Sequence, residues 1–309
     1  MRESTIGNVR IIQADDAGRR VFADDAEVTE ILRILREEPR EEYSALINEK
    51  KAWPFLLHLS HVRTNVIRSL PFLKTEHVLE IGAGCGVLTG FLTERCASVT
   101  GIEPSLLRCR ANAEKNRGHK NLTLLAMTAS EAEDAAGRSY DTVLWIDAPV
   151  DAVQEEGLRM PAEEKLNFAL AHLREGGRLI LGVDNRLGMR FLAGEKEEYT
   201  ARYFEGLEGY PAEENRYTAS RKEWEQLLND RGMQEAVFYY PYPDHRFARQ
   251  LYSDDWLPEA EELSVNYQNF ARKRMALFDD AAVWRSLAEN DLFPQFANSF
   301  LIVSRKGIV

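Results

Sequence analysis

The sequence is poor in cysteine, in long apolar runs and in positive charge. Its 309 residues contain three cysteines, an odd number clustered around one segment without metal-ligand spacing: Cys85, Cys96 and Cys109. We therefore expect reduced thiols packed as small apolar groups, and no bound metal. No apolar run approaches the roughly 20 residues that a membrane helix needs, and the N-terminus MRESTIGNVR lacks the apolar core of a secretory signal. These absences predict a cytoplasmic protein that does not insert into membranes.

The shortage of basic residues disfavours nucleic acid as a partner. Lysine and arginine number 39 against 50 aspartates and glutamates, for a formal net charge of -11. Such a charge repels phosphate backbones unless a local basic patch overrides it. With 44% hydrophobic and 29% charged residues, the chain can bury a full α/β core. One core domain with additions is expected.

The most informative segment spans residues 78–104. An apolar, β-prone run at 78–81 leads directly into Gly82, Ala83, Gly84, Cys85 and Gly86, and a helical segment follows at 87–95. Backbone without Cβ atoms allows a ligand to approach closely. A second strand at 98–102 ends at Glu103, about 20 residues after the glycines, where a carboxylate can accept hydrogen bonds from ribose hydroxyls. The segment predicts a site for an adenosine-containing cofactor.

The position of the third glycine decides which cofactor is expected. A dinucleotide fingerprint that starts at Gly82 requires glycine at position 87, but Val87 stands there and the third glycine falls at 86. The pattern Glu80, Gly82, Gly84, Gly86 resembles that of class I S-adenosylmethionine-dependent methyltransferases, whose cofactor carries no phosphate. A tight turn without a ligand would explain one or two glycines, but not three together with Glu103.

The rest of the chain continues an alternating α/β pattern. Helices are expected at 106–116, 162–175 (ended by Gly176 and Gly177) and 220–231, and strands at 122–126, 140–146, 178–183, 235–240 and 299–304. The resemblance implies a Rossmann-like, seven-stranded class I methyltransferase sheet of order 3-2-1-4-5-7-6, with strand 7 antiparallel.

Three segments exceed that core. Residues 1–75 form an N-terminal extension, with short strands expected near 9–13 and 20–22 and a helix at 25–37, which could cap the sheet or form a homodimer. The cofactor-binding domain then spans 76–309. Within it, 187–219 is longer than connections usually are and suggests a substrate lid, and 241–298, with a helix at 279–289, is expected to wall the acceptor pocket.

Six segments resemble bacterial methyltransferases associated with surface-polysaccharide and glycosyltransferase loci. They read HLSHVRTNVIRSLPF, LEIGAGCGVLTG, DNRLGMRFLAG, FEGLEGYP, YYPYPDHRF and LFPQFANSFLIV, and they cover nearly the whole chain from about Trp53. The resemblance implies a sugar or glycan acceptor and an association with glycosyltransferases. The chain departs from the group after the fourth strand, where residues 145–149 read WIDAP.

The pattern also assigns residues to the cofactor. The amides of the glycine loop should surround its methionine part, with Glu80 orienting the loop through water and Glu103, followed by Pro104, holding the ribose. By family position, Thr128 and Ala129 should border the adenine, and Asp147 and Ala148 should face cofactor and acceptor.

Methyl transfer from a sulfonium is an in-line displacement, so positioning of the acceptor should supply most of the acceleration. A general base is needed only for a hydroxyl acceptor. Candidates are Asp147, Asp184, His58, His61 and His245.

Three of these candidates have a purely structural alternative. His58 and His61 could simply pack the helix before the first strand, and Asp184 could cap the end of its strand. Tyr239, Tyr240 and Tyr242 could stack on a sugar but are more typical of core, and the run 195–198 is expected to be a solvated loop.

Two other functions are weighed. The loop LEIGAGCGVLTGFLTER resembles that of the rRNA dimethyladenosine enzymes, but IDAPVD lacks their Asn-rich, Pro-aromatic signature after strand four. The chain could also bind S-adenosylmethionine without catalysis, as a partner subunit. The acceptor, and whether oxygen or nitrogen is methylated, stay open at this stage.

Overall fold

The structure is a computed structural model that describes residues 1–137, 139–146, 160–263 and 277–308. Its strands are β1 (Arg2–Ile6), β2 (Val9–Gln13), β3 (His77–Ile81), β4 (Ser98–Ile102), β5 (Leu122–Ala126), β6 (Tyr140–Ile146), β7 (Leu173–Asp184), β8 (Met233–Tyr242), β9 (Gln250–Ser253) and β10 (Ser299–Lys306). Its α-helices are α1 (Asp25–Glu37), α2 (Tyr43–Lys50), α3 (Trp53–Leu59), α4 (Asn65–Arg68), α5 (Val87–Thr93), α6 (Leu106–Lys115), α7 (Ala129–Ala135), α8 (Ala162–His172), α9 (Met189–Leu192), α10 (Arg221–Asn229), α11 (Asp280–Glu289) and α12 (Phe293–Phe296).

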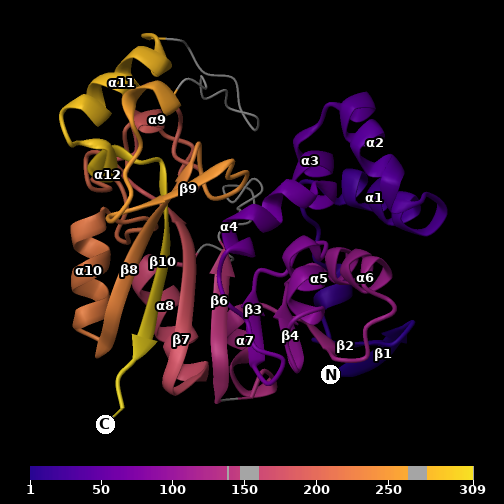
Figure 1. Cartoon of the computed structure of the whole chain (residues 1–309). Helices are drawn as coiled ribbons and strands as arrows, with labels where there is room; N and C mark the ends of the chain where they lie inside the picture. The colour runs from indigo at the N-terminus through magenta and orange to yellow at the C-terminus, as the bar shows by residue number, and fades with distance from the viewer. Residues whose placement is uncertain (138, 147–159, 264–276, 309) are drawn as a thin grey trace.

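All of these strands belong to one sheet, of order β1-β2-β5-β4-β3-β6-β7-β10-β8-β9 (Figure 1). The strands expected from the sequence lie side by side within it, as β5-β4-β3-β6-β7-β10-β8, and β10 is antiparallel to both of its neighbours. The sheet as a whole departs from the seven-stranded prediction, because β1 and β2 extend one edge and β9 extends the other. The strand expected at 20–22 is absent, and β1 was not anticipated.

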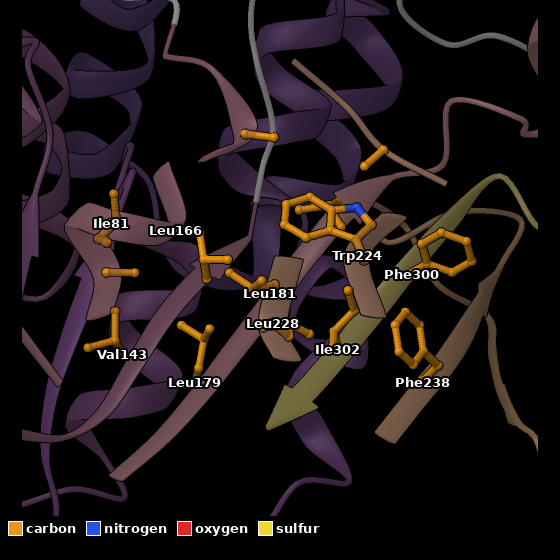
Figure 2. Packing of buried hydrophobic residues seen from close by; sticks show 14 of the residues in the cluster. Ile81, Val143, Leu166, Leu179, Leu181, Trp224, Leu228, Phe238, Phe300 and Ile302 are labelled. Atoms are coloured by element: carbon orange, nitrogen blue, oxygen red, sulfur yellow. The ribbon is translucent and has the colours of Figure 1, made fainter. Parts of the chain in front are cut away.

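Side chains alternate between the two faces of the sheet, as strand geometry requires. Leu79 and Ile81 of β3 pack in one core with α7, α8 and α10, whereas Val78 packs in a second core with α4, α5 and α6. Figure 2 shows the first core, in which Leu166 of α8 and Trp224 and Leu228 of α10 gather against the sheet, near Leu181 of β7 and Ile302 of β10. The middle of the sheet is therefore covered on both faces, as the parallel arrangement demands.

Local side-chain caps mark the start of some helices. Ser220 caps α10 with a reciprocal Ser220–Glu223 capping box, and the Asp279 carboxylate caps α11. The helix expected at 162–175 is shorter than predicted: α8 ends at His172, and β7 takes in Gly176 and Gly177. In the part of the chain that the structure describes, no helix is both long and apolar enough to span a membrane.

The N-terminal helices and the segments that follow β7 and β8 lie at the same end of the molecule, beyond the carboxyl ends of the parallel strands (Figure 1). A hydrogen bond joins them, from Asn65 Nδ2 in α4 to the carbonyl of Ala248 at 3.0 Å. Leu57 of α3 also packs with Phe247. Both additions therefore border the carboxyl ends of the strands, where ligands of open α/β sheets bind.

Candidate functional site

The glycine loop between β3 and α5 adopts backbone conformations that side chains disfavour. Gly82, Gly84 and Gly86 have φ of +77°, +50° and +85°. The amides of Gly82 and Ala83 both donate to the carbonyl of Ile102, at 2.9 and 3.0 Å. The loop is thereby tied to the end of β4, next to Glu103.

The first and third glycines serve different purposes. A Cβ at Gly82 would meet no atom within 4 Å, so this part of the backbone faces open space. A Cβ at Gly86 would lie 2.4 Å from Oδ1 of Asn112, a fully buried side chain whose Nδ2 donates to Thr89 Oγ1 at 2.9 Å. Gly86 therefore permits close packing of α5 against α6, and Gly82 leaves bare backbone for a ligand.

The Glu103 carboxylate turns back onto the loop. Its Oε2 accepts from the Gly84 amide at 3.0 Å and its Oε1 from the Ser105 amide at 2.9 Å, with Arg108 Nη1 at 3.6 Å. Burial raises its pKa, against the opposing effects of Arg108 and the two amides. A carboxylate offers about four lone-pair sites, so capacity for two hydroxyl donors remains.

A side-chain network from the N-terminal extension covers this loop. Asp24 accepts from Arg108 Nη2 at 2.5 Å and contacts His58 Nε2 at 3.2 Å. A Cβ at Gly84 would lie 3.8 Å from His58 Nδ1, so the imidazole sits against the loop. Sequence analysis missed Asp24 and Arg108, because nothing in their local sequence signals that segments so far apart in the chain meet here.

Burial and charged neighbours set the protonation states of His58 and Asp24 over the loop. Burial lowers the pKa of His58 to about 4, so the ring is neutral near pH 7. Burial alone would raise the pKa of Asp24, but His58 and Arg108 outweigh it and lower that pKa to about 2. A neutral His58 with Nε2–H directed to the Asp24 carboxylate keeps the Nδ1 lone pair free of that contact.

Glu80 of β3 is buried two residues before the loop, with a neutral hydroxyl as its hydrogen-bond donor. It is 2% exposed and accepts from Thr89 Oγ1 at 2.6 Å. Burial raises its pKa to about 7, even though Arg63 acts in the opposite direction.

Arg63 is a third residue that sequence analysis missed. Its side chain is 9% exposed, and its Nε has no hydrogen-bond partner among the residues that the structure describes. Burial and the charge of Arg246 together lower its pKa to about 10, against the effects of Glu80 and Asp244. A buried guanidinium with spare donor capacity is suited to an anionic group on a ligand.

Of the four residues placed by family position, only the two expected at the adenine are described. Thr128 is the N-cap of α7 and forms a capping box with Glu131, and Ala129 is the first residue of that helix. The amide of Met127 donates to the carbonyl of Glu103 at 3.2 Å, which places the start of α7 beside the end of β4. Asp147 and Ala148 lie outside the described residues.

A dense ionic cluster stands at the end of β7. Asp184 contacts Arg246 Nη2 at 2.8 Å and Arg190 Nη2 at 2.6 Å, and His245 Nδ1 lies 3.7 Å from it. Arg246 also contacts Glu198 at 3.0 Å. Burial would raise the pKa of Asp184, but the two arginines hold it well below its usual range.

The prediction of a solvated loop at 195–198 is wrong. Glu195, Glu197 and Glu198 are 3%, 2% and 8% exposed. Glu198 contacts Arg246, while Glu197 accepts from the amides of Tyr199 and Thr200, both at 2.8 Å. A local run of acids is compatible with burial when distant arginines and nearby amides compensate it, and the sequence does not show those partners.

The remaining candidates separate clearly. His61 is exposed and lines a cavity behind α5, away from the open side of Gly82. Tyr240 and Tyr242 are core residues, and the three cysteines are buried free thiols, as expected. Among the residues that the structure describes, no group of three or more His, Cys, Asp or Glu side chains is placed to hold a metal ion.

Comparisons with known proteins find similarity only among solved structures. No family model matches the chain, and no curated protein matches it. A SAM-dependent methyltransferase from Archaeoglobus fulgidus is 16% identical with a TM-score of 0.46, over 85% of this chain and 100% of that one. The CurJ carbon methyltransferase is 16% identical with a TM-score of 0.46, over 92% of this chain and 68% of that one.

A third structure is phosphoethanolamine N-methyltransferase 1 of Haemonchus contortus, in complex with phosphoethanolamine and S-adenosylhomocysteine. It is 13% identical with a TM-score of 0.45, over 94% of this chain and 51% of that one, so the chain spans about half its length. At such identities, these likenesses carry no residue roles over to this chain.

Proposed function

We propose that this protein is a class I S-adenosylmethionine-dependent methyltransferase. The observation that carries the proposal is the Glu103 carboxylate, held 3.0 Å from the Gly84 amide at the end of β4, beside a loop with three positive-φ glycines. Bare backbone and a carboxylate at the ends of adjacent parallel strands suit a nucleoside. Val87 at the start of α5 disfavours a dinucleotide, whose fingerprint places glycine there.

Four groups of this chain would hold the cofactor. The open backbone at Gly82 would lie along its methionine part, and Glu103 would accept hydrogen bonds from the ribose hydroxyls. The spare donors of Arg63 would bind the carboxylate of the methionine part, with Glu80 beside them. Thr128 and Ala129 would border the adenine.

When bound, the cofactor would supply a methyl group on a sulfonium: an acceptor oxygen or nitrogen attacks the methyl carbon in line, and the neutral thioether leaves as the carbon–sulfur bond breaks. The protein's contribution is to hold the acceptor in that line and to exclude water. Segments 187–219 and 241–298 would shape the acceptor pocket, and residues 1–75 would cap the site.

We propose His58 over Asp184 as the proton acceptor for a hydroxyl substrate. Burial lowers its pKa to about 4, so it is a modest base, but its ring is neutral near pH 7 and its Nε2 is oriented by Asp24. Asp184 is bound by two arginines that hold its pKa low, so it is a weak base. We propose that Asp184 positions the ionic cluster instead.

The acceptor is proposed to be polar, with a sugar or glycan as its class. A buried ionic cluster lies at the ends of β7 and β8 and consists of Asp184, Asp244, Arg190 and Arg246. Burial of these charges costs desolvation free energy, which an acceptor site for an apolar molecule would not require. The sugar class rests on the resemblance to methyltransferases of polysaccharide loci. Labelled methyl from S-adenosylmethionine should enter a sugar-containing fraction; label in RNA would support the alternative enzyme class, and binding without turnover would support a partner subunit.

Calorimetric titration tests the cofactor assignment. S-adenosylhomocysteine should bind, and Glu103→Ala should weaken its binding at least about tenfold, the usual effect of losing a charged hydrogen bond. Glu163→Gln, at an exposed site on α8, serves as the matched control and should bind normally. Heat from NADH with none from S-adenosylhomocysteine would refute the assignment.

A further inference from the structure

A cavity of about 370 Å³ lies behind the glycine loop, between α5, the end of α6 and the N-terminal helices. Gly86 and Val87 line it, but Gly82 and Glu103 do not. It is therefore separate from the open face at which the cofactor is proposed to bind.

The lining of this cavity is basic, although the whole chain has a net charge of -11. Six basic side chains contribute to it, against the single acid Glu94: Arg40, His61, Arg68, Arg95, Lys115 and His119. Arg95 Nη1 contacts Glu94 at 3.1 Å, so these two charges compensate each other. A surplus of positive charge remains.

Three of these cations have only neutral partners, or none, among the described residues. Arg68 Nη2 donates to Thr64 Oγ1 at 2.9 Å, and Lys115 Nζ donates to the carbonyl of His58 at 2.6 Å. Arg40 forms no ion pair with any residue that the structure describes. Burial, with a smaller contribution from the charge of Arg40, lowers the pKa of Lys115 to about 8. Like charges therefore converge where an anion would relieve their repulsion.

The cavity also offers aromatic surface. The ring of Tyr43 is half-buried at its wall, and Phe91 of α5 forms another part of the lining. Arg95 stacks on Phe91 with its guanidinium carbon 3.8 Å from the ring centroid. The volume lies within the range of about 300–1,000 Å³ typical of small-molecule sites. It exceeds the room that a single oxyanion needs.

We propose that this cavity binds a small organic molecule through a phosphate group, which Arg40, Arg68 and Lys115 contact, while Tyr43 and Phe91 contact its organic part. A phosphate group carries close to two negative charges at neutral pH, and arginine matches its oxygens with paired donors. The bounded shape and the acidity of the rest of the chain favour a small molecule over an RNA strand. The proposal is independent of methyl transfer.

Calorimetry on the full chain at low salt tests it, with inorganic phosphate, glucose 1-phosphate, ADP and a single-stranded RNA oligonucleotide as probes. At least one organic phosphate should bind with a Kd below about 1 mM and more tightly than inorganic phosphate. Arg40→Ala and Arg68→Ala should each weaken that binding about tenfold. Arg285→Ala, an exposed arginine on α11 with no described ion pair, should leave it unchanged.

Several outcomes would overturn the proposal. They are no binding of either organic phosphate, equal binding of inorganic phosphate, equal weakening by Arg285→Ala, or RNA binding that is tighter than both and steeply salt-dependent. Titration of Arg40→Ala with S-adenosylhomocysteine separates the two sites, because it should match the wild type whichever result the phosphates give.

Discussion

Two buried carboxylates on neighbouring parts of the same sheet show opposite electrostatic behaviour. Glu80 of β3 and Asp184 of β7 are 2% and 3% exposed, so both have lost nearly all contact with water. The pKa of Glu80 is raised to about 7, whereas that of Asp184 is held well below its usual range. Burial acts in the same direction on both; the difference lies in their partners.

Neighbouring cations decide the outcome. Glu80 has one hydrogen bond, from the neutral Thr89 hydroxyl, while Asp184 contacts the guanidinium groups of Arg190 and Arg246. The glycine-loop side of the site therefore carries an acid that can gain or lose a proton near neutral pH. The β7 side carries a fixed ionic framework. Substituting four carboxylates by their amides, one at a time, and measuring the free energy of unfolding tests this comparison.

The largest effect is expected for Asp184→Asn. The substitution keeps the shape of the side chain but removes the anion that lies nearest to both buried arginines, which should lower the free energy of unfolding by about 3 kcal/mol or more. Urea denaturation at pH 7 measures it. A loss under about 1 kcal/mol would mean that the cluster is hydrated and that the contrast with Glu80 is not one of pairing.

Glu80→Gln should raise the free energy of unfolding at high pH, in contrast to Asp184→Asn. Because the folded pKa of about 7 exceeds the ordinary value of 4.5, the folded wild type holds a proton that the unfolded chain has lost between these pH values. Wild-type stability should therefore fall as pH rises through this window, and the variant should escape that part of the fall. The variant should match the wild type near pH 4 and exceed it by about 3 kcal/mol at pH 8. Parallel stability curves would contradict the shift.

Asp24→Asn should give an intermediate loss. The folded pKa of about 2 lies below the ordinary 3.8, so the carboxylate stabilises the fold above about pH 4, and this contribution is lost as pH falls through about 2. At pH 7 the variant should lose about 2 kcal/mol, and the difference from the wild type should shrink on acidification. Urea titrations at several pH values measure this, and a pH-independent difference would point to a steric effect.

The smallest effect is expected for Glu163→Gln. Glu163 is 68% exposed and contacts Arg231 at 3.2 Å, so water and salt already screen the pair. The loss in unfolding free energy should stay below about 1 kcal/mol and decrease further in salt. A loss as large as that of Asp24→Asn would show that exposure does not separate these carboxylates.

Features encoded over short stretches were predictable from the sequence. The glycine loop, Glu103, the helix at 25–37 and the Ser220 cap depend on residues close together in the chain. The alternating pattern predicted the strands of the central sheet, and the resemblance implied an order for them, but the sheet that the structure describes has ten strands rather than seven. The addition of β1 and β2 to one edge and of β9 to the other was not predictable in this way. Their pairing depends on which strand of the folded sheet has unpaired backbone groups at its outer side.

The sequence by itself determined where bare backbone occurs and that a carboxylate follows the next strand, since glycine and acid act there through their own conformation and charge. Only the tertiary structure decided that Asp24, His58 and Arg108 cover that loop, and that the acids at 195–198 are buried against arginines. The physical reason is that the charge state of a buried group depends on its spatial neighbours, and those neighbours come from segments far apart in the chain.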